Sequence, residues 1–250
     1  MANYKVRSYR DCEYFISTQS FLKLYPVLES LKNNRGRFIH VIGAPGTGKS
    51  ANIYSTLAML DLNIYEAFLF LDSVHLSPDE VWEKFWTTLT EDLGAETRDE
   101  IYQKAAQYDL VLFADIFLDS EFVEEDKVGL GLWTEEHGPK TVTFYLRVLG
   151  EYLKHRKDLK KVNIVTQTAW ILKYRGVKYD LLTDFYLLSW ILVFFLKMFF
   201  EVVRISYTEE EMVKIVKNYE PHCSEEEIKT LIKKFGCRPR FILEALEKKN

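Results

Sequence analysis

Gly43-Ala-Pro-Gly-Thr-Gly-Lys-Ser50 decides the fold of this chain. The stretch satisfies every fixed position of the phosphate-binding motif G-x-x-x-x-G-K-[ST]. An apolar run before it, Phe38-Ile-His-Val-Ile42, predicts a buried strand, and residues 51–60 after it have the apolar spacing of a helix. Strand, glycine-rich loop and helix aim backbone N–H groups and a helix N-terminus at one point, which attracts phosphate. The sequence therefore predicts that the chain binds a nucleoside triphosphate here.

The residues of this loop have separate expected roles. Gly43, Gly46 and Gly48 allow the backbone to turn tightly. Lys49 is expected to reach the β- and γ-phosphates of ATP, and the Ser50 hydroxyl to hold Mg²⁺. The alternative is an ordinary glycine turn, which the flanking strand and helix disfavour. The predicted nucleotide-binding residues of the loop are Gly43, Ala44, Pro45, Gly46, Thr47, Gly48, Lys49, Ser50 and Ala51.

Length, charge and cysteine content limit the class of protein. The 250 residues can hold one α/β domain and a small helical unit. The net charge of −4 argues against a protein that mainly coats nucleic acid, although a local basic patch is allowed. Cys12, Cys223 and Cys237 are odd in number and lack metal-ligand spacing. The N-terminus also has no apolar stretch resembling a signal peptide. Both observations favour a reduced, cytoplasmic location.

A second motif follows about sixty residues after the loop. Leu110-Val-Leu-Phe-Ala-Asp115 is an apolar run that ends in an acid, the form of a Walker B strand whose carboxylate holds Mg²⁺ beside the loop hydroxyl. We expect Asp115 to be that acid. Asp72 and Asp119 are rivals, and a solvated aspartate without a role is the plain alternative.

The residue after this acid predicts slow turnover. Many ATPases of this type place a glutamate there to polarise the attacking water, whereas this chain has Ile116. Either hydrolysis is slow or the base comes from elsewhere, and Glu121 is the candidate substitute. The strand predicted over residues 162–168 also ends in polar residues. Thr166, Gln167 or Thr168 could contact the γ-phosphate or the attacking water, or could simply cap the strand.

The remaining core is predicted from periodicity. A strand is expected over residues 66–72, and helices over 17–31, 78–93 and 141–159. The aromatic stripe of the helix over 78–93 (Trp82, Phe85, Trp86) favours core packing over stacking on a base. Residues 154–161 are the most basic stretch, which favours a solvated helix end over a contact with DNA phosphates.

The segment 185–200 is almost wholly apolar. It is shorter than the roughly 20 residues that span a bilayer, so we expect a buried helix. Membrane association and a partner-facing surface are the alternatives, and a membrane partner is disfavoured.

A final strand is expected over residues 201–206. Three capped helices follow, with Thr208 and Ser224 as N-caps, Gly236 as a stop and Pro239 opening the last helix. The predicted domains are a core with an N-terminal helix over 1–206 and a helical lid over 207–250.

With these motifs in order, the chain resembles the AAA+ ATPases. The similar branch is that of origin-recognition and DnaA-like initiators and helicase loaders, including DnaA-like ATPases of archaeal viruses. The resemblance implies an α/β P-loop parallel sheet flanked by helices, with a small C-terminal helical lid. It implies ATP and Mg²⁺ as cofactors and slow ATP hydrolysis that switches assembly or loads a partner on DNA during replication. A nucleotide-gated interaction protein and a STAND-like signalling ATPase are the alternative functions.

The resemblance also implies roles for particular residues. The lid arginine that senses the γ-phosphate matches Arg240, with Arg238 as runner-up, and the sensor on the polar-ended strand falls at Thr166 or Gln167. An arginine finger has no match in its usual stretch, where Arg175 and Arg156 are the nearest candidates. The predicted catalytic set is thus Lys49, Asp115, Glu121, Thr166, Gln167 and Arg240. The expected partners are ATP or ADP and a second copy or another protein, with DNA left open in the absence of an appended DNA-binding domain.

Overall fold

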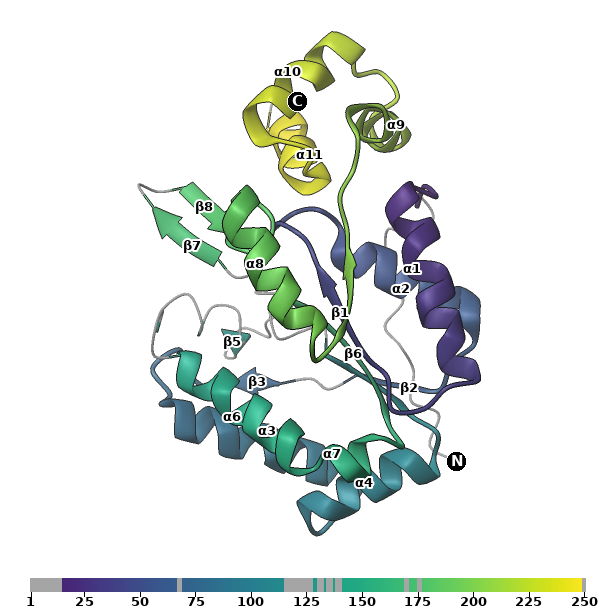
Figure 1. Ribbon diagram of the computed structural model, residues 1–250. Coiled ribbons are helices and arrows are strands. Elements are labelled where there is room, and N and C mark those ends of the chain that lie inside the picture. Colours follow the sequence, from purple (N-terminus) through teal and green to yellow (C-terminus); the bar gives the residue numbers. More distant parts are fainter. Residues whose placement is uncertain are drawn as a thin grey trace. The chain divides into compact units, whose positions relative to one another are not determined.

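The computed structural model describes residues 15–66, 69–114, 128–129, 133, 137, 141–168, 171–174 and 177–248 (Figure 1). Its helices are α1 (Gln19–Glu29), η2 (Ser30–Lys32, a 3₁₀ turn), α2 (Lys49–Leu60), α3 (Pro78–Leu93), α4 (Arg98–Gln107), α6 (Thr141–Lys154), α7 (Arg156–Leu159), α8 (Tyr186–Lys197), α9 (Glu209–Tyr219), α10 (Glu225–Phe235) and α11 (Pro239–Glu247). Its strands are β1 (Phe38–Ile42), β2 (Ile64–Glu66), β3 (Phe70–Leu71), β4 (Val111–Ala114), β5 (Val128–Gly129), β6 (Asn163–Thr168), β7 (Ile171–Tyr174), β8 (Val177–Asp180) and β9 (Glu201–Arg204).

Five of these strands form one parallel sheet in the order β2-β4-β6-β1-β9. Parallel strands are buried on both faces, which accounts for the near-continuous apolar runs of β1 and β4. Val41 of β1 lies opposite Val203 of β9, and Ala114 of β4 lies opposite Thr166 of β6. The predicted class, an α/β P-loop sheet flanked by helices, is confirmed.

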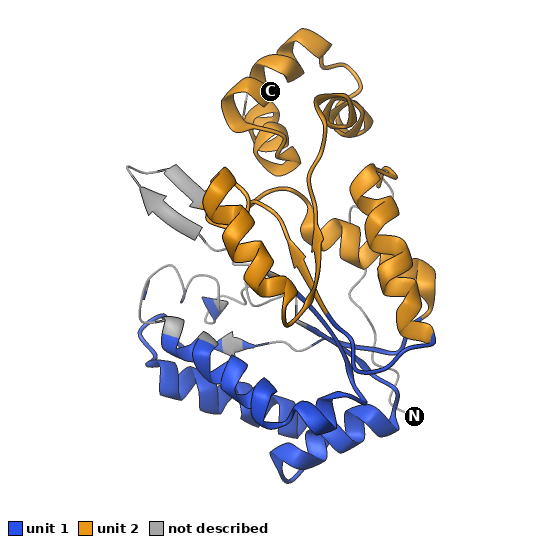
Figure 2. Ribbon diagram, viewed as in Figure 1, with its two compact units in different colours: residues 1–6, 33–38, 62–166 blue, residues 7–32, 39–61, 167–250 orange. Residues whose placement is uncertain are grey.

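The chain divides into two compact units (Figure 2). Within the described residues, unit 1 holds 33–38 and 62–166, and unit 2 holds 15–32, 39–61 and 167–248. The core of unit 1 is built by α3, whose N-terminus carries the capping box of Ser77 with Glu80. Trp82 and Trp86 of α3 are buried there, and the Arg98 guanidinium lies 4.9 Å from the Trp86 ring. The prediction that this aromatic stripe belongs to the core is confirmed.

Unit 2 contains the phosphate-loop segment and the C-terminal helices. Helix α1 packs against α2, and α9, α10 and α11 form a three-helix group that we call the C-terminal cluster (Figure 1). Thr208 and Glu211 form a reciprocal capping box at the start of α9, as two orphan N–H groups require. The interior of the cluster is apolar and consists of Met212, Val216, Ile228, Ile232, Ile242 and Leu246.

Three predictions about local structure are wrong. The single strand expected over residues 66–72 is two short strands, because β3 pairs antiparallel with β5 outside the main sheet. The helix expected over 141–159 breaks at His155, whose ring contacts Tyr102 and faces the carboxylates of Glu151 and Asp99. Sequence reasoning also missed the antiparallel pair of β7 and β8.

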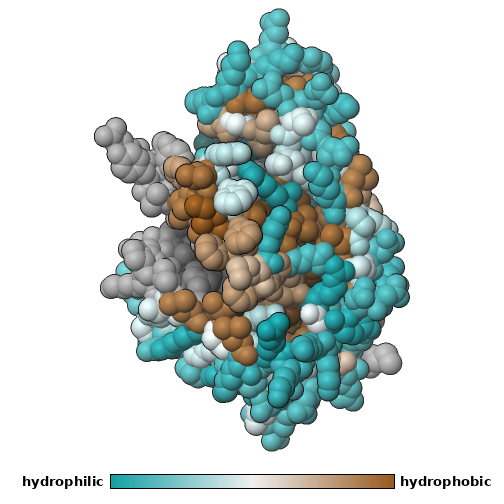
Figure 3. Space-filling model, in the orientation of Figure 1, coloured by the Kyte–Doolittle hydropathy of each residue, from teal (hydrophilic) through white to brown (hydrophobic). Residues whose placement is uncertain are grey.

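The third wrong prediction concerns the burial of α8. This helix was expected to be buried, yet Ser189 is its only buried side chain, and the other side chains of α8 are partly or fully exposed. Figure 3 shows apolar residues gathered on the surface over α8. Among the described residues, no helix combines the length and hydropathy that crossing a bilayer requires.

Candidate nucleotide-binding site

The glycine-rich loop joins β1 to α2 in unit 2. Gly46 and Gly48 have φ angles of 78° and 71°, the left-handed region that favours glycine. Gly43 is required for space instead, because a Cβ there would lie 2.8 Å from Thr47 Oγ1 and 3.0 Å from the Ile205 carbonyl oxygen. The loop backbone therefore turns directly into the N-terminus of α2, where Gly48 is the N-cap.

Polar side chains of the loop donate hydrogen bonds to the loop's own carbonyl oxygens. Lys49 Nζ donates to the carbonyl oxygens of Gly43 at 2.8 Å and Ala44 at 3.4 Å, and the Lys49 side chain is buried. Thr47 Oγ1 donates to the Ala44 carbonyl at 2.8 Å. The lysine ammonium is thus held at the centre of the loop, where an oxyanion can take over its hydrogen bonds.

Ser50 connects the loop to β6. Gln167 Nε2 donates to Ser50 Oγ at 3.0 Å, and the Gln167 side chain is buried. Of the three polar residues proposed at the end of β6, the structure brings Gln167 to the loop. Thr166 lies at the paired position opposite Ala114, and the side chain of Thr168 is outside the described set.

Sequence reasoning missed two residues of the site, Asn52 and Tyr207. Asn52 Nδ2 donates to the Gly48 carbonyl at 2.8 Å and to the Tyr207 hydroxyl at 2.7 Å. Burial raises the pKa of Tyr207 to about 12, so its hydroxyl stays protonated at neutral pH. The Tyr207 ring packs against the interior of the C-terminal cluster. A part-buried hydrogen bond therefore joins the loop helix to a residue that packs against that cluster.

Arg238 and Arg240, at the start of α11, have different environments. The backbone N–H of Arg240 donates to the Gly46 carbonyl at 3.2 Å, and a Cβ added at Gly46 would lie 3.4 Å from the Arg240 Cβ. Arg240 Nε lies 3.6 Å from a Glu244 carboxylate oxygen. Arg238 instead pairs with Asp184, and its Nη2 donates to the two carboxylate oxygens at 2.8 and 2.9 Å. The structure brings Arg240 to the loop and holds Arg238 in an ion pair.

Several predicted residues cannot be placed. Asp115, Ile116, Asp119, Glu121 and Arg175 lie outside the residues that the structure describes. Of the rivals to Asp115, Asp72 is exposed and pairs with Lys84 of α3 at 3.2 Å. In the described part of the chain, no group of three or more His, Cys, Asp or Glu side chains could hold a metal ion.

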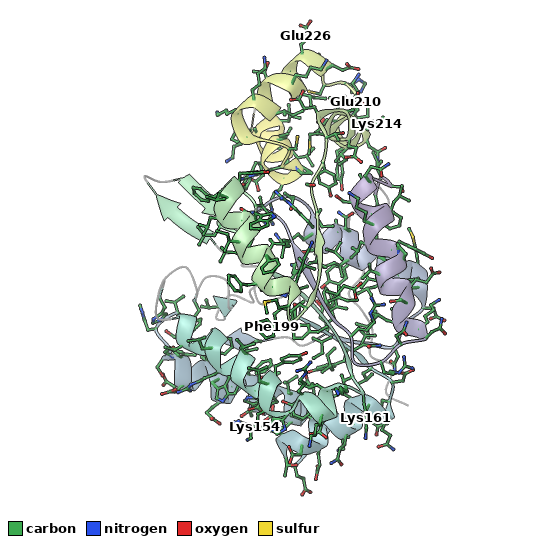
Figure 4. The ribbon with its side chains drawn as sticks, viewed as in Figure 1. Lys154, Lys161, Phe199, Glu210, Lys214 and Glu226 are labelled. Carbon is green, nitrogen blue, oxygen red and sulfur yellow. The ribbon has the colours of Figure 1, made fainter. Side chains whose placement is uncertain are left out.

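The basic stretch lies at the ends of α6 and α7 in unit 1. Lys154 and Lys161 mark its limits in Figure 4. Its lysine and arginine side chains are exposed, whereas Leu159 is buried. An open surface pocket is lined by Leu153, Lys154, Arg156, Lys157 and Lys160. Exposed basic side chains are compatible with both interpretations of this stretch, a solvated helix end and a contact with DNA phosphates. Arg156, a candidate arginine finger, also lies in this stretch.

The sheet order and the loop between β1 and α2 define the class of protein. The fold is an α/β P-loop fold, with a parallel sheet flanked by helices. No protein-family model matches the chain, and no curated protein matches it.

Three solved structures are similar to this chain at low sequence identity. AMPPCP-bound DnaA from Aquifex aeolicus is 15% identical with a TM-score of 0.45, over 94% of this chain and 62% of that one. The Thermotoga maritima RuvB Holliday junction branch migration motor is 14% identical with a TM-score of 0.44, over 92% and 60%. The DnaC helicase loader is 15% identical with a TM-score of 0.36, over 78% and 94%. The chain spans about 60% of the length of the DnaA and RuvB structures, and similarity at this level carries no function over to it.

Proposed function

We propose that this chain binds ATP with Mg²⁺ at the loop of residues 43–50 and hydrolyses it slowly. The observation that carries the proposal is the loop itself, with the Lys49 ammonium held at its centre by the Gly43 and Ala44 carbonyl oxygens. Those carbonyls orient the lysine without neutralising it. A triphosphate offers the ammonium full negative charge, so phosphate oxygens are the stronger partners.

In this proposal the other loop residues bind and orient the nucleotide. Backbone N–H groups from Gly46 to Ala51, other than that of Thr47, which donates to the Ala44 carbonyl, donate to the phosphates. The Ser50 hydroxyl and the Asp115 carboxylate hold Mg²⁺. Ser50 fits this role, because a hydroxyl oxygen is a ligand that a hard cation accepts, and the bond from Gln167 joins the Ser50 side chain to the end of β6. When bound, the Mg²⁺ ion would neutralise charge on the phosphates. Gln167, which the same bond holds beside Ser50, would contact the γ-phosphate or the attacking water.

We further propose that residues 207–250 act as a lid that responds to the nucleotide. The support is the hydrogen bond from the Arg240 N–H to Gly46, since a ligand that reshapes the loop would alter this contact. A change in lid position would then regulate assembly, or loading of a partner on DNA, in the manner of DnaA-like initiators. With little turnover, the same contacts would serve a nucleotide-gated interaction protein.

Calorimetric titration of the full chain with ATP–Mg²⁺ tests the proposal. Lys49→Ala should reduce ATP affinity about ten- to a hundredfold, because it removes a buried charge-assisted contact of about 1.5–3 kcal/mol. Lys229→Ala is the matched control, since it removes an exposed lysine of α10 in the same unit. Unchanged ATP affinity in a folded Lys49→Ala protein would reject nucleotide binding at this loop.

A further inference from the structure

Helix α8 presents an apolar face to the surface of unit 2. Its exposed stripe follows helical spacing, with Leu187, Trp190, Ile191, Phe194 and Met198 at positions i, i+3, i+4, i+7 and i+11. The opposite side holds the inward residues, where the Ser189 hydroxyl donates to the Leu181 carbonyl at 3.0 Å. A surface helix normally carries polar residues on its outer side. The reversed pattern indicates a face that another molecule covers.

The exposed side chains on this face are large. Trp190 is 65% exposed and Phe194 is 56% exposed, and their rings stack with centroids 6.0 Å apart. Lys197 is the only charged residue of the helix and lies at its C-terminal end. Figure 4 labels Phe199 just beyond that end. The exposed large apolar residues are Phe185, Tyr186, Leu187, Leu188, Trp190, Ile191, Phe194, Phe195, Met198 and Phe199.

The size and composition of the face match one half of a protein interface. With aromatic side chains that bury about 150–250 Å² each when covered, these partly exposed residues offer on the order of 800 Å². A standard stable interface buries about 800 Å² per partner, whereas a typical monomer exposes apolar patches of about 300–600 Å². The centre of the face carries no charge, and a lysine lies at its rim. Protein interfaces have the same arrangement, with a core that is enriched in Trp and Phe and a polar rim.

We propose that the face of α8 binds the same face of a second copy of this chain. The helix is symmetric enough for a two-fold contact, because the middle of the stripe falls between Ile191 and Phe194. An antiparallel pairing about that point opposes the two helix dipoles and leaves each Lys197 at the rim. In this arrangement Leu187 of one copy approaches Met198 of the other. The proposal does not depend on nucleotide binding.

A membrane surface fits the face less well. Interfacial helices carry Lys and Arg on their polar side and are attracted to anionic lipids. Helix α8 has one lysine, is flanked by Asp184 and Glu201, and belongs to a chain with a net charge of −4. Cosedimentation with vesicles that contain one part in three phosphatidylserine distinguishes the two partners.

Light scattering after size exclusion tests the pairing with the full chain. At about 50 µM the wild-type protein should have twice the 29.5 kDa protomer mass, because standard-size interfaces reach micromolar affinity or tighter. Trp190→Lys and Phe194→Lys should each raise the dimer dissociation constant at least about 30-fold, as buried aromatic hot spots do. Leu146→Lys is the control, since Leu146 is 60% exposed on α6, and it should leave the dimer intact.

A disulfide test does not depend on how the lysine variants fold. With the three native cysteines replaced by serine, Leu187→Cys and Met198→Cys proteins should cross-link when mixed and oxidised, and Leu187→Cys alone should not. A monomeric wild type at 50 µM would overturn the proposal. So would a dimer that persists in both lysine variants, self-linking of Leu187→Cys without mixed products, or vesicle binding by a monomer.

Discussion

Breaking the ion pair between Arg238 and Asp184 should weaken attachment of the C-terminal cluster within unit 2. Arg238 Nη2 contacts both Asp184 carboxylate oxygens, and each side chain is only 19% exposed. Exposed pairs contribute about 0–1 kcal/mol, and removing one partner of a fully buried pair costs about 3–5 kcal/mol. This pair lies between those limits. We therefore expect a coupling free energy of about 1–2 kcal/mol in a double-mutant cycle.

The cycle uses Arg238→Ala, Asp184→Asn and the double variant, measured by urea denaturation. Asparagine is the chosen replacement because Asp184 Oδ2 also accepts the backbone N–H of Asp180 at 2.8 Å, and an amide oxygen retains that bond. Each single variant should lose stability, and the double variant should lose less than their sum. Additive losses, with coupling below about 0.5 kcal/mol, would refute the reasoning. A selective loss of ATP affinity in Arg238→Ala would instead make Arg238 the phosphate sensor.

Three further predictions concern the nucleotide and pH. Arg240→Ala should weaken ATP binding about ten- to a hundredfold and barely change ADP binding, because only ATP presents a γ-phosphate; equal losses in calorimetry would indicate a structural role. The wild-type chain should hydrolyse ATP well below the roughly 10 s⁻¹ of a median enzyme, and a brisk rate in a phosphate-release assay would imply an unidentified base. Burial lowers the pKa of His40 to about 4. The unfolded chain therefore takes up a proton first, and stability should fall as pH drops from about 6.5 to 4, by at most about 1.4 kcal/mol per pH unit. Urea denaturation of His40→Gln should show a flatter dependence.

The features that were predictable from sequence are local. The loop follows from glycines whose φ angles or close contacts exclude a Cβ, and helix starts follow from capping residues such as Ser77 and Thr208. In each case the residues that decide the structure lie within about eight positions of one another. The parallel sheet was predictable from the motif, because strand, loop and helix belong to a recurrent parallel architecture, whereas the order of its strands was not predicted.

The features that were not predictable depend on distant partners. Gln167 and Ser50 are 117 positions apart, and Asn52 and Tyr207 are 155 apart. Many polar residues could have met the loop, and their spacing in the chain does not select one. The prediction that α8 is buried was wrong for a related reason. An apolar stripe in the sequence is the same whether the surface that covers it belongs to the same chain or to another molecule. The pair of β7 and β8 had a weak signal, two short runs separated by Arg175-Gly176.

The hydrogen bond between the Arg240 N–H and the Gly46 carbonyl has an electrostatic consequence. It brings the N-terminus of α11 to the loop where α2 also begins. Each helix start carries about half a positive elementary charge. Two such ends, added to Lys49, concentrate positive potential at one point of a molecule whose net charge is −4. The strength of that field depends on a contact that moves with α11. The attraction of the loop for anions should therefore weaken whenever α11 withdraws, even if no side chain leaves the phosphates.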